Sequence, residues 1–117
     1  MRNVFINFTN HPSELWGAEE KHAALQYGEI VELPFPAVDP QKDRDYITKL
    51  AEECVSRMLL LNPAAVLCQG EFCLVYQVVS RLKEEGITVL SACSERITTE
   101  EQGKKVSVFK FRQFREY

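Results

Sequence analysis

The sequence lacks the features that mark membrane, secreted and duplex-binding proteins. No apolar run reaches the roughly 18 residues that cross a bilayer, and no apolar stretch with a cleavage site follows Met1. We therefore expect a cytoplasmic protein that does not enter a membrane. The formal net charge is −3, so no global basic field attracts the chain to duplex nucleic acid or to an anionic membrane.

Metal-binding and dinucleotide-binding motifs are also missing. The four cysteines form no C-x-x-C pair and the two histidines lie far from them, so we predict no metal site. Each cysteine lies among apolar residues and is interpreted as a small buried hydrophobe. A single glycine, Gly70, stands where a G-x-G-x-x-G fingerprint would need three, and there is no G-x-S-x-G elbow, so no cofactor is expected.

The sequence does contain a strand–helix–strand unit in residues 64–96. Apolar runs at residues 64–68 and 87–93 flank a helical pattern in Phe72, Val75, Tyr76, Val79 and Leu82, which ends at Gly86. Two strands that are apolar on both faces are typical of a parallel sheet covered on both sides.

Further elements complete one domain spanning residues 1–117. Strands are predicted at residues 3–9 and 29–33, and helices at residues 18–27 and 43–61, with a proline-rich connection at residues 34–40. Residues 106–114 alternate as an edge strand, antiparallel to the strand that ends at Ser94, after a turn at residues 100–105. The fold class predicted is α/β: a small Rossmann-like three-layer sandwich with a mostly parallel five-stranded sheet, order 2-1-3-4-5 along the chain.

Polar residues follow three of the predicted strands, and parallel strands bring their carboxyl ends to one edge, where such sheets bind ligands. We predict ligand-binding residues there at Thr9, Asn10, Gln69, Gly70, Glu71, Ser94 and Glu95, and catalytic candidates at His11, Ser13 and Arg96.

Structural interpretations of the same residues stay open. His11 and Ser13 also fit a turn, Arg96 also fits a surface ion pair with Glu95, and Glu71 also complements a helix dipole. The basic, phenylalanine-rich final strand is interpreted as a charged edge that deters aggregation, with a nucleic-acid or dimer surface as the alternative. The helix that begins near Phe72 is apolar on more than one side, which predicts a homodimer contact.

Three segments resemble small CRISPR-associated proteins of the CARF (CRISPR-associated Rossmann fold) type. FINFTNHPSELW at residues 5–16 resembles their N-terminal signature, and LCQGEF and LSACSER fall where that fold places ligand-facing turns. The resemblance implies a homodimer that binds a cyclic oligoadenylate, and in some members a ring nuclease that cuts this messenger without a metal. It assigns roles to Asn10, His11, Ser13, Gln69, Ser94 and Arg96, with His11 as acid/base and Arg96 as phosphate clamp.

Two classes of function are therefore open. One is binding of a cyclic oligoadenylate, with or without metal-independent phosphodiesterase activity. The other is a non-catalytic Rossmann-like interaction module, or an enzyme that acts on another small nucleotide-like ligand in the same crevice.

Overall fold

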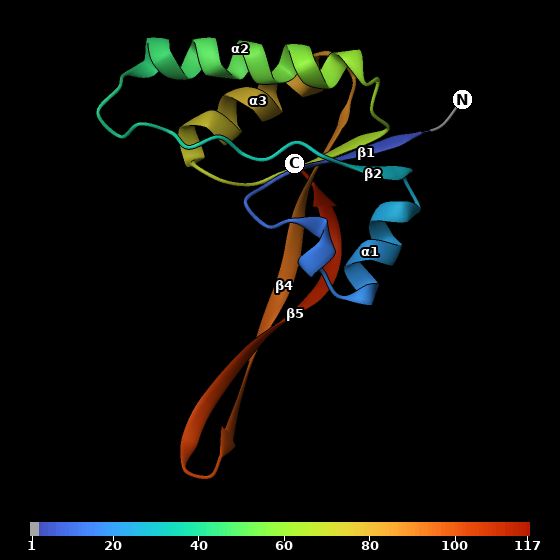
Figure 1. Cartoon of the computed structure of the whole chain (residues 1–117), viewed down its shortest axis with the longest axis vertical. Helices are drawn as coiled ribbons and strands as arrows, with labels where there is room; N and C mark the ends of the chain where they lie inside the picture. The colour runs from blue at the N-terminus through green and yellow to red at the C-terminus, as the bar shows by residue number, and fades with distance from the viewer. Residues whose placement is uncertain (1–2) are drawn as a thin grey trace.

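One mixed five-stranded sheet organises residues 3–117, the part of the chain that the computed structural model describes (Figure 1). No helix in this part is long and apolar enough to cross a bilayer. The elements in chain order are β1 (Val4–Phe8), the 3-10 helix η1 (Ser13–Leu15), α1 (Ala18–Leu25), β2 (Glu29–Glu32), α2 (Arg44–Leu60), β3 (Ala65–Cys68), α3 (Phe72–Glu84), β4 (Thr88–Glu101) and β5 (Lys104–Glu116).

The strand order is β2-β1-β3-β4-β5, as the sequence predicts. β1 lies parallel to both β2 and β3, β3 lies parallel to β4, and β4 and β5 are antiparallel. The chain leaves β1 toward β2 on one side and later returns to β3 on the other side. The carboxyl ends of β1 and β3 therefore flank the switch point of the sheet, where open α/β sheets bind ligands.

Side chains from the two faces of the sheet enter two separate apolar clusters. Ile6 and Val66 pack with α2 and α3, whereas Phe5 and Leu67, one residue away in each strand, pack with Trp16 and Ala24. This alternation is the period of a strand that is buried on both faces.

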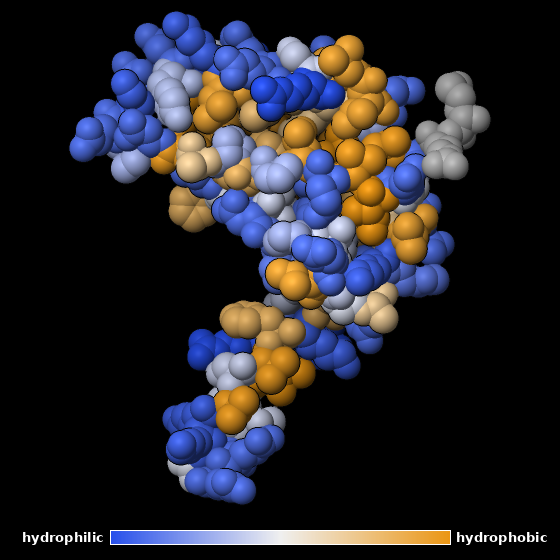
Figure 2. Space-filling model, in the orientation of Figure 1, coloured by the Kyte–Doolittle hydropathy of each residue, from blue (hydrophilic) through white to orange (hydrophobic). Residues whose placement is uncertain are grey.

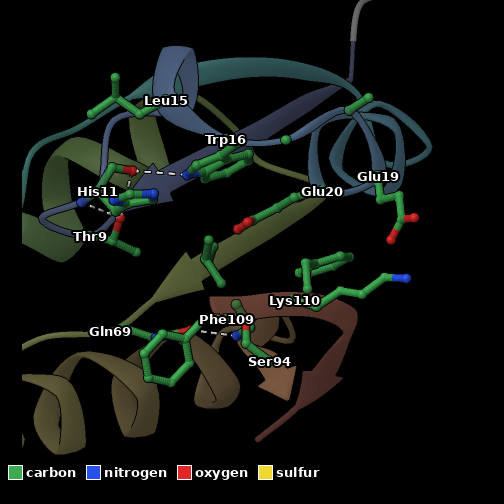
Figure 3. A pocket seen from close by; sticks show the side chains of 15 residues that line it. Thr9, His11, Leu15, Trp16, Glu19, Glu20, Gln69, Ser94, Phe109 and Lys110 are labelled. Carbon is green, nitrogen blue, oxygen red and sulfur yellow. Dashed lines mark hydrogen bonds between the residues drawn. The ribbon is translucent and has the colours of Figure 1, made fainter. Parts of the chain in front are cut away.

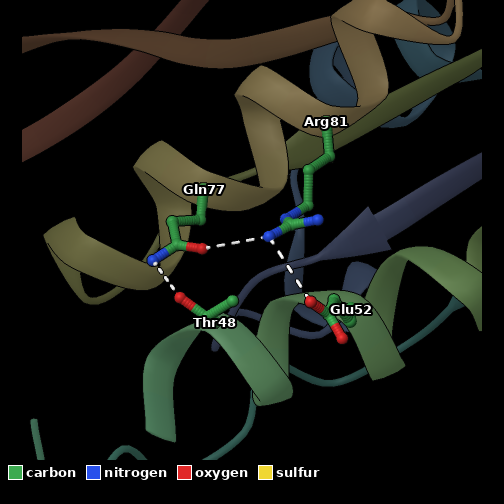
Figure 4. A network of polar contacts seen from close by, with 4 residues as sticks. All are labelled: Thr48, Glu52, Gln77 and Arg81. Carbon is green, nitrogen blue, oxygen red and sulfur yellow. Dashed lines mark hydrogen bonds and ion pairs between the residues drawn. The ribbon is translucent and has the colours of Figure 1, made fainter. Parts of the chain in front are cut away.

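The helix ends follow the signals in the sequence. Asp43 accepts a hydrogen bond from the Tyr46 amide at 3.3 Å and caps α2, and Gly86 follows α3 with a φ of +74°. Polar side chains join the two helices: Gln77 Nε2 donates to Thr48 Oγ1 at 3.0 Å, and Arg81 lies 3.8 Å from Glu52 (Figure 4).

β4 and β5 continue as a two-stranded ribbon far beyond the rest of the sheet (Figure 1). We call residues 94–110 the arm; every residue in it is exposed. The prediction that this strand ends near Cys93 was wrong, because β4 runs to Glu101. The turn lies within the predicted residues 100–105, at Gln102-Gly103. β4 outlasts β3 because β5 continues to satisfy its backbone groups on the other side. The antiparallel pairing and the positive φ of Gly103, +78°, are confirmed.

Candidate functional site

A cleft of about 650 Å³ lies at the carboxyl ends of β1 and β3, between α1 and the base of the arm (Figure 3). The segment after β1 forms one wall, and β4 and β5 form the opposite wall. The residues that line it are Thr9, His11, Leu15, Trp16, Gly17, Ala18, Glu19, Glu20, Leu67, Gln69, Ala92, Ser94, Phe109, Lys110 and Phe111.

A buried amide, Asn7 in β1, holds the wall that carries His11. Its side chain is 2% exposed, and its Nδ2 donates to the His11 carbonyl at 3.0 Å and to Glu32 Oε1 at 3.1 Å. The Thr9 hydroxyl donates to Asn7 Oδ1 at 2.8 Å, and Trp16 Nε1 donates to the same His11 carbonyl at 3.0 Å. Every polar atom of the Asn7 side chain has a partner, so its burial costs little desolvation free energy. The amide can therefore fix the path of the chain after β1.

His11 and Glu20 approach the cleft from different elements. His11 follows β1, and Glu20 lies on the first turn of α1 with its carboxylate pointing into the cavity (Figure 3). Burial raises the pKa of the Glu20 carboxyl above its ordinary value, and the nearby His11 lowers it by a smaller amount. Glu20 therefore keeps its proton to a higher pH than a free glutamate does.

Gln69 extends the sheet at the point where β3 ends. Its Oε1 accepts a hydrogen bond from the Ala92 amide of β4, beyond the last ladder pair, Leu67 with Leu90. The Nε2 group has no partner among residues 3–117 and lies at the cleft. It can donate to a ligand oxygen.

β5 supplies the cleft with two phenylalanines and a lysine. The Phe109 side chain is 70% exposed, and Lys110 lies next to it in the strand. One extra residue in β5 at Arg112 shifts the register between Cys93 and Ser94, so that Phe111 and Phe114 lie on the same face with ring centres 5.0 Å apart.

One of the comparisons with known proteins identifies a family. The model of the Uncharacterized protein MJ1673 family matches residues 3–115, which include every residue of the cleft. The chain belongs to the MJ1673 family. No curated protein and no solved structure matches it.

In this member of the MJ1673 family, the fold brings together four of the residues predicted from the sequence: Thr9, His11, Gln69 and Ser94. Asn10 is exposed outside the cleft. Ser13 begins η1, and its amide donates to Glu32 Oε1 at 2.6 Å, so it has the turn role that was left open for it.

Gly70 and Glu71 lie outside the cleft lining and have structural roles. A Cβ at Gly70 would lie 2.6 Å from the ring of Phe35, so the glycine makes room for a core aromatic side chain. Glu71 caps α3, accepting a hydrogen bond from the Leu74 amide at 2.8 Å, which is the structural alternative noted for it.

Glu95 and Arg96 lie on the arm because β4 passes through the point where the sequence predicts its end. Arg96 Nη2 donates to Ser107 Oγ at 3.2 Å, and Glu95 pairs with Arg112, not with Arg96. The prediction that these two residues form a turn at the ligand edge was wrong.

Sequence reasoning missed Asn7, Glu20 and Lys110 as contributors to the cleft. Asn7 stands within an apolar strand, Glu20 lies in the first turn of a helix, where acidic residues are common, and Lys110 lies in the basic final strand that is interpreted as a charged edge. Two features of the sequence point to Lys110: the alternation of the final strand, which predicts one covered face, and its basic composition, which leaves a nucleic-acid surface open.

Metal ligands do not gather in the described chain: no group of three His, Cys, Asp or Glu side chains is placed to hold an ion among residues 3–117. The four cysteines are free thiols. Burial raises the pKa of the Cys68 thiol to about 12, so this group stays protonated and unreactive.

Proposed function

We propose that the cleft binds a cyclic oligoadenylate and cleaves it, so that the protein acts as a ring nuclease in CRISPR-type defence. The resemblance of residues 5–16 to the CARF signature supports the ligand. One observation of the site carries the catalytic part: an imidazole, His11, and a carboxyl with a raised pKa, Glu20, face the same cleft at the switch point of the sheet.

The two groups suit a transfer within the RNA chain. His11 accepts the proton of a ribose 2′-hydroxyl, and the 2′-oxygen attacks the adjacent phosphorus. Glu20 gives its proton to the 5′-oxygen as the P–O5′ bond breaks. The products are a 2′,3′-cyclic phosphate and a free 5′-hydroxyl, with no other reactant consumed.

The remaining cleft residues suit the charge and the bases of this ligand. Gln69 Nε2 donates to a phosphate oxygen, and the Lys110 ammonium at the rim of the cleft attracts the anionic ligand. The exposed ring of Phe109 offers an aromatic face on which an adenine can stack.

The proposal includes a three-layer Rossmann-like fold, a homodimer and a cytoplasmic location. The two apolar clusters on opposite faces of the sheet support the layers. The four free thiols fit the reducing conditions of the cytoplasm.

The test is incubation of the protein with cyclic tri-, tetra- and hexa-adenylate, with and without chelator, followed by chromatography of the products. We expect cleavage of at least one ring in the presence of chelator. His11→Ala removes the base and should slow cleavage by about 10²–10⁴-fold while leaving binding within a few-fold.

The chain offers a matched control in its other histidine. His22 lies on α1 outside the cleft lining, and its ring nitrogen lies 3.4 Å from Gln26 Nε2. His22→Ala should cleave at the wild-type rate. Equal rates for the two variants would contradict the role of His11, and the absence of both binding and cleavage with every ring would contradict the ligand.

A non-catalytic interaction module is the second candidate, and the surface of α3 favours it. Phe72 is 88% exposed and Tyr76 is 74% exposed, near the N-terminal end of that helix. Large apolar side chains that lie together on a surface mark contacts with other proteins. This function would leave His11→Ala without effect on partner binding, whereas Tyr76→Ala would weaken it.

A further inference from the structure

The arm exposes apolar side chains that nothing in the described chain covers. Ile97 and Val106 are each 37% exposed, Val108 is 57% exposed, and Figure 2 shows apolar side chains gathered along the ribbon. A two-stranded ribbon without other cover is marginally stable in water. The arm therefore needs a partner surface.

The register of the ribbon defines one face, which we call the aliphatic face. Residues paired across antiparallel strands point to the same side, and every second pair lies on the same face. From the base to the tip, the pairs on this face are Glu95 with Lys110, Ile97 with Val108, Thr99 with Val106, and Glu101 with Lys104.

This face is complementary to itself. A two-fold axis along the ribbon exchanges β4 and β5, so that Ile97 meets Val108 of the second copy and Glu101 meets its Lys104. We propose that the aliphatic face packs against the same face of a second copy of this chain about such an axis. Opposite charges then meet at the tip and aliphatic side chains meet in the centre, as in a specific homodimer interface. At the base, Glu95 is held by Arg112 of its own chain, so the tip pair sets the specificity.

The exposed surface area of the chain is large enough to supply such an interface. A compact monomer of 13.5 kDa exposes about 6,500 Å², whereas this chain exposes 8040 Å². The excess of about 1,500 Å² exceeds the roughly 800 Å² that each partner contributes to a standard interface. The two paired strands twist about each other between the base and the tip of the ribbon, so the outer part of the arm is turned relative to the sheet (Figure 1).

The first experiment is sedimentation of the full chain without any ligand, so its result does not depend on the proposed nuclease activity. We expect a dimer for the wild type, and at least tenfold weaker association for Val108→Glu, which puts a charge in the centre of the face. Phe72→Glu, on the exposed surface of α3, is the matched control and should dimerise as the wild type does. A monomeric wild type, or a dimer that Phe72→Glu breaks and Val108→Glu does not, would overturn the proposal.

The second experiment tests the two-fold axis by charge complementation. Glu101→Lys and Lys104→Glu each place like charges across the axis, so each variant alone should associate about tenfold more weakly than the wild type. Mixed together, they form a heterodimer in which both contacts are again between opposite charges, and association should return to the wild-type level. Because each chain keeps its own sequence in the mixture, folding effects cannot produce this recovery. A mixture that associates no better than the separate variants would overturn the axis.

Discussion

The hydroxyl of Tyr117 donates a hydrogen bond of 2.6 Å to the carbonyl oxygen of Cys68 and so joins the end of β5 to the end of β3. The backbone amide of Tyr117 also donates to the Val89 carbonyl at 3.0 Å, and Lys83 Nζ donates to the Tyr117 carbonyl at 2.8 Å. These contacts hold the end of β5 against the parallel part of the sheet.

Tyr117→Phe should lower the free energy of unfolding by about 1 kcal/mol, because it removes the hydrogen bond from the hydroxyl to the Cys68 carbonyl. Tyr76→Phe, on an exposed side chain, is the control and should change stability by less than about 0.5 kcal/mol. Urea unfolding measures both.

Burial raises the pKa of Tyr117 above its ordinary value, so the unfolded chain loses this proton first as the pH rises. Wild-type stability should therefore fall above about pH 10 more steeply than that of Tyr117→Phe.

Asn7→Leu should destabilise the fold by about 1–3 kcal/mol, because it removes a fully bonded buried amide and leaves Glu32 with one donor fewer. The same change should reduce ligand binding in the cleft, since the segment that carries His11 loses its anchor. Asn10→Leu, three residues away and exposed, should leave both unchanged. Similar urea midpoints for the two variants would contradict the structural role of Asn7.

Gly70→Ala should cost about 1–3 kcal/mol because its new Cβ meets the Phe35 ring. If that contact is the cause, a smaller side chain at position 35 should relieve it. The double variant Gly70→Ala with Phe35→Leu should then lose less than the sum of the two single losses, by at least about 0.5 kcal/mol in a double-mutant cycle. Additive losses would show that the ring does not limit this position.

Glu20→Gln should raise the melting temperature at pH 7. The folded chain holds the Glu20 proton to a higher pH than the unfolded chain, so wild-type stability falls as the pH rises past the ordinary carboxyl value of 4.5. Glutamine does not titrate, and the difference between the two proteins should therefore disappear below that pH. The exposed neighbour Glu19→Gln is the control; the same pH profile for both variants would contradict the effect of burial. A gain in stability together with a loss of ring cleavage would fit a functional site that costs stability.

The sheet could be predicted from sequence because its strands carry a strong signal. The runs at residues 64–68 and 87–93 are apolar on both faces, Gly86 marks the end of the helix between them, and Pro63 follows the helix before them. These features specify parallel strands and the order of the sheet without knowledge of contacts. The end of the first strand, with Thr9 and His11, and Gln69 after the third strand then follow from topology.

The arm and the rest of the cleft could not be predicted in the same way. A ribbon that is exposed on both faces shows no alternation of buried and exposed side chains. The sequence of residues 94–101 therefore predicts a polar loop and not a strand. Gly70 was taken for a ligand-facing glycine because a sequence does not show that the Phe35 ring packs on it. Glu20 gains its raised pKa from burial in a wall that only the tertiary structure assembles.

β5 runs as one strand from the tip of the arm, past the cleft, to Tyr117, whose hydroxyl contacts the Cys68 carbonyl. Ordering of the outer ribbon by a second copy therefore also orders Phe109 and Lys110, which form one wall of the cleft. Coupling between two binding equilibria is reciprocal. If self-association increases the affinity of the cleft for a small molecule, that molecule increases the affinity of self-association by the same factor. A single continuous strand would thus make the assembly of this protein responsive to what occupies its cleft.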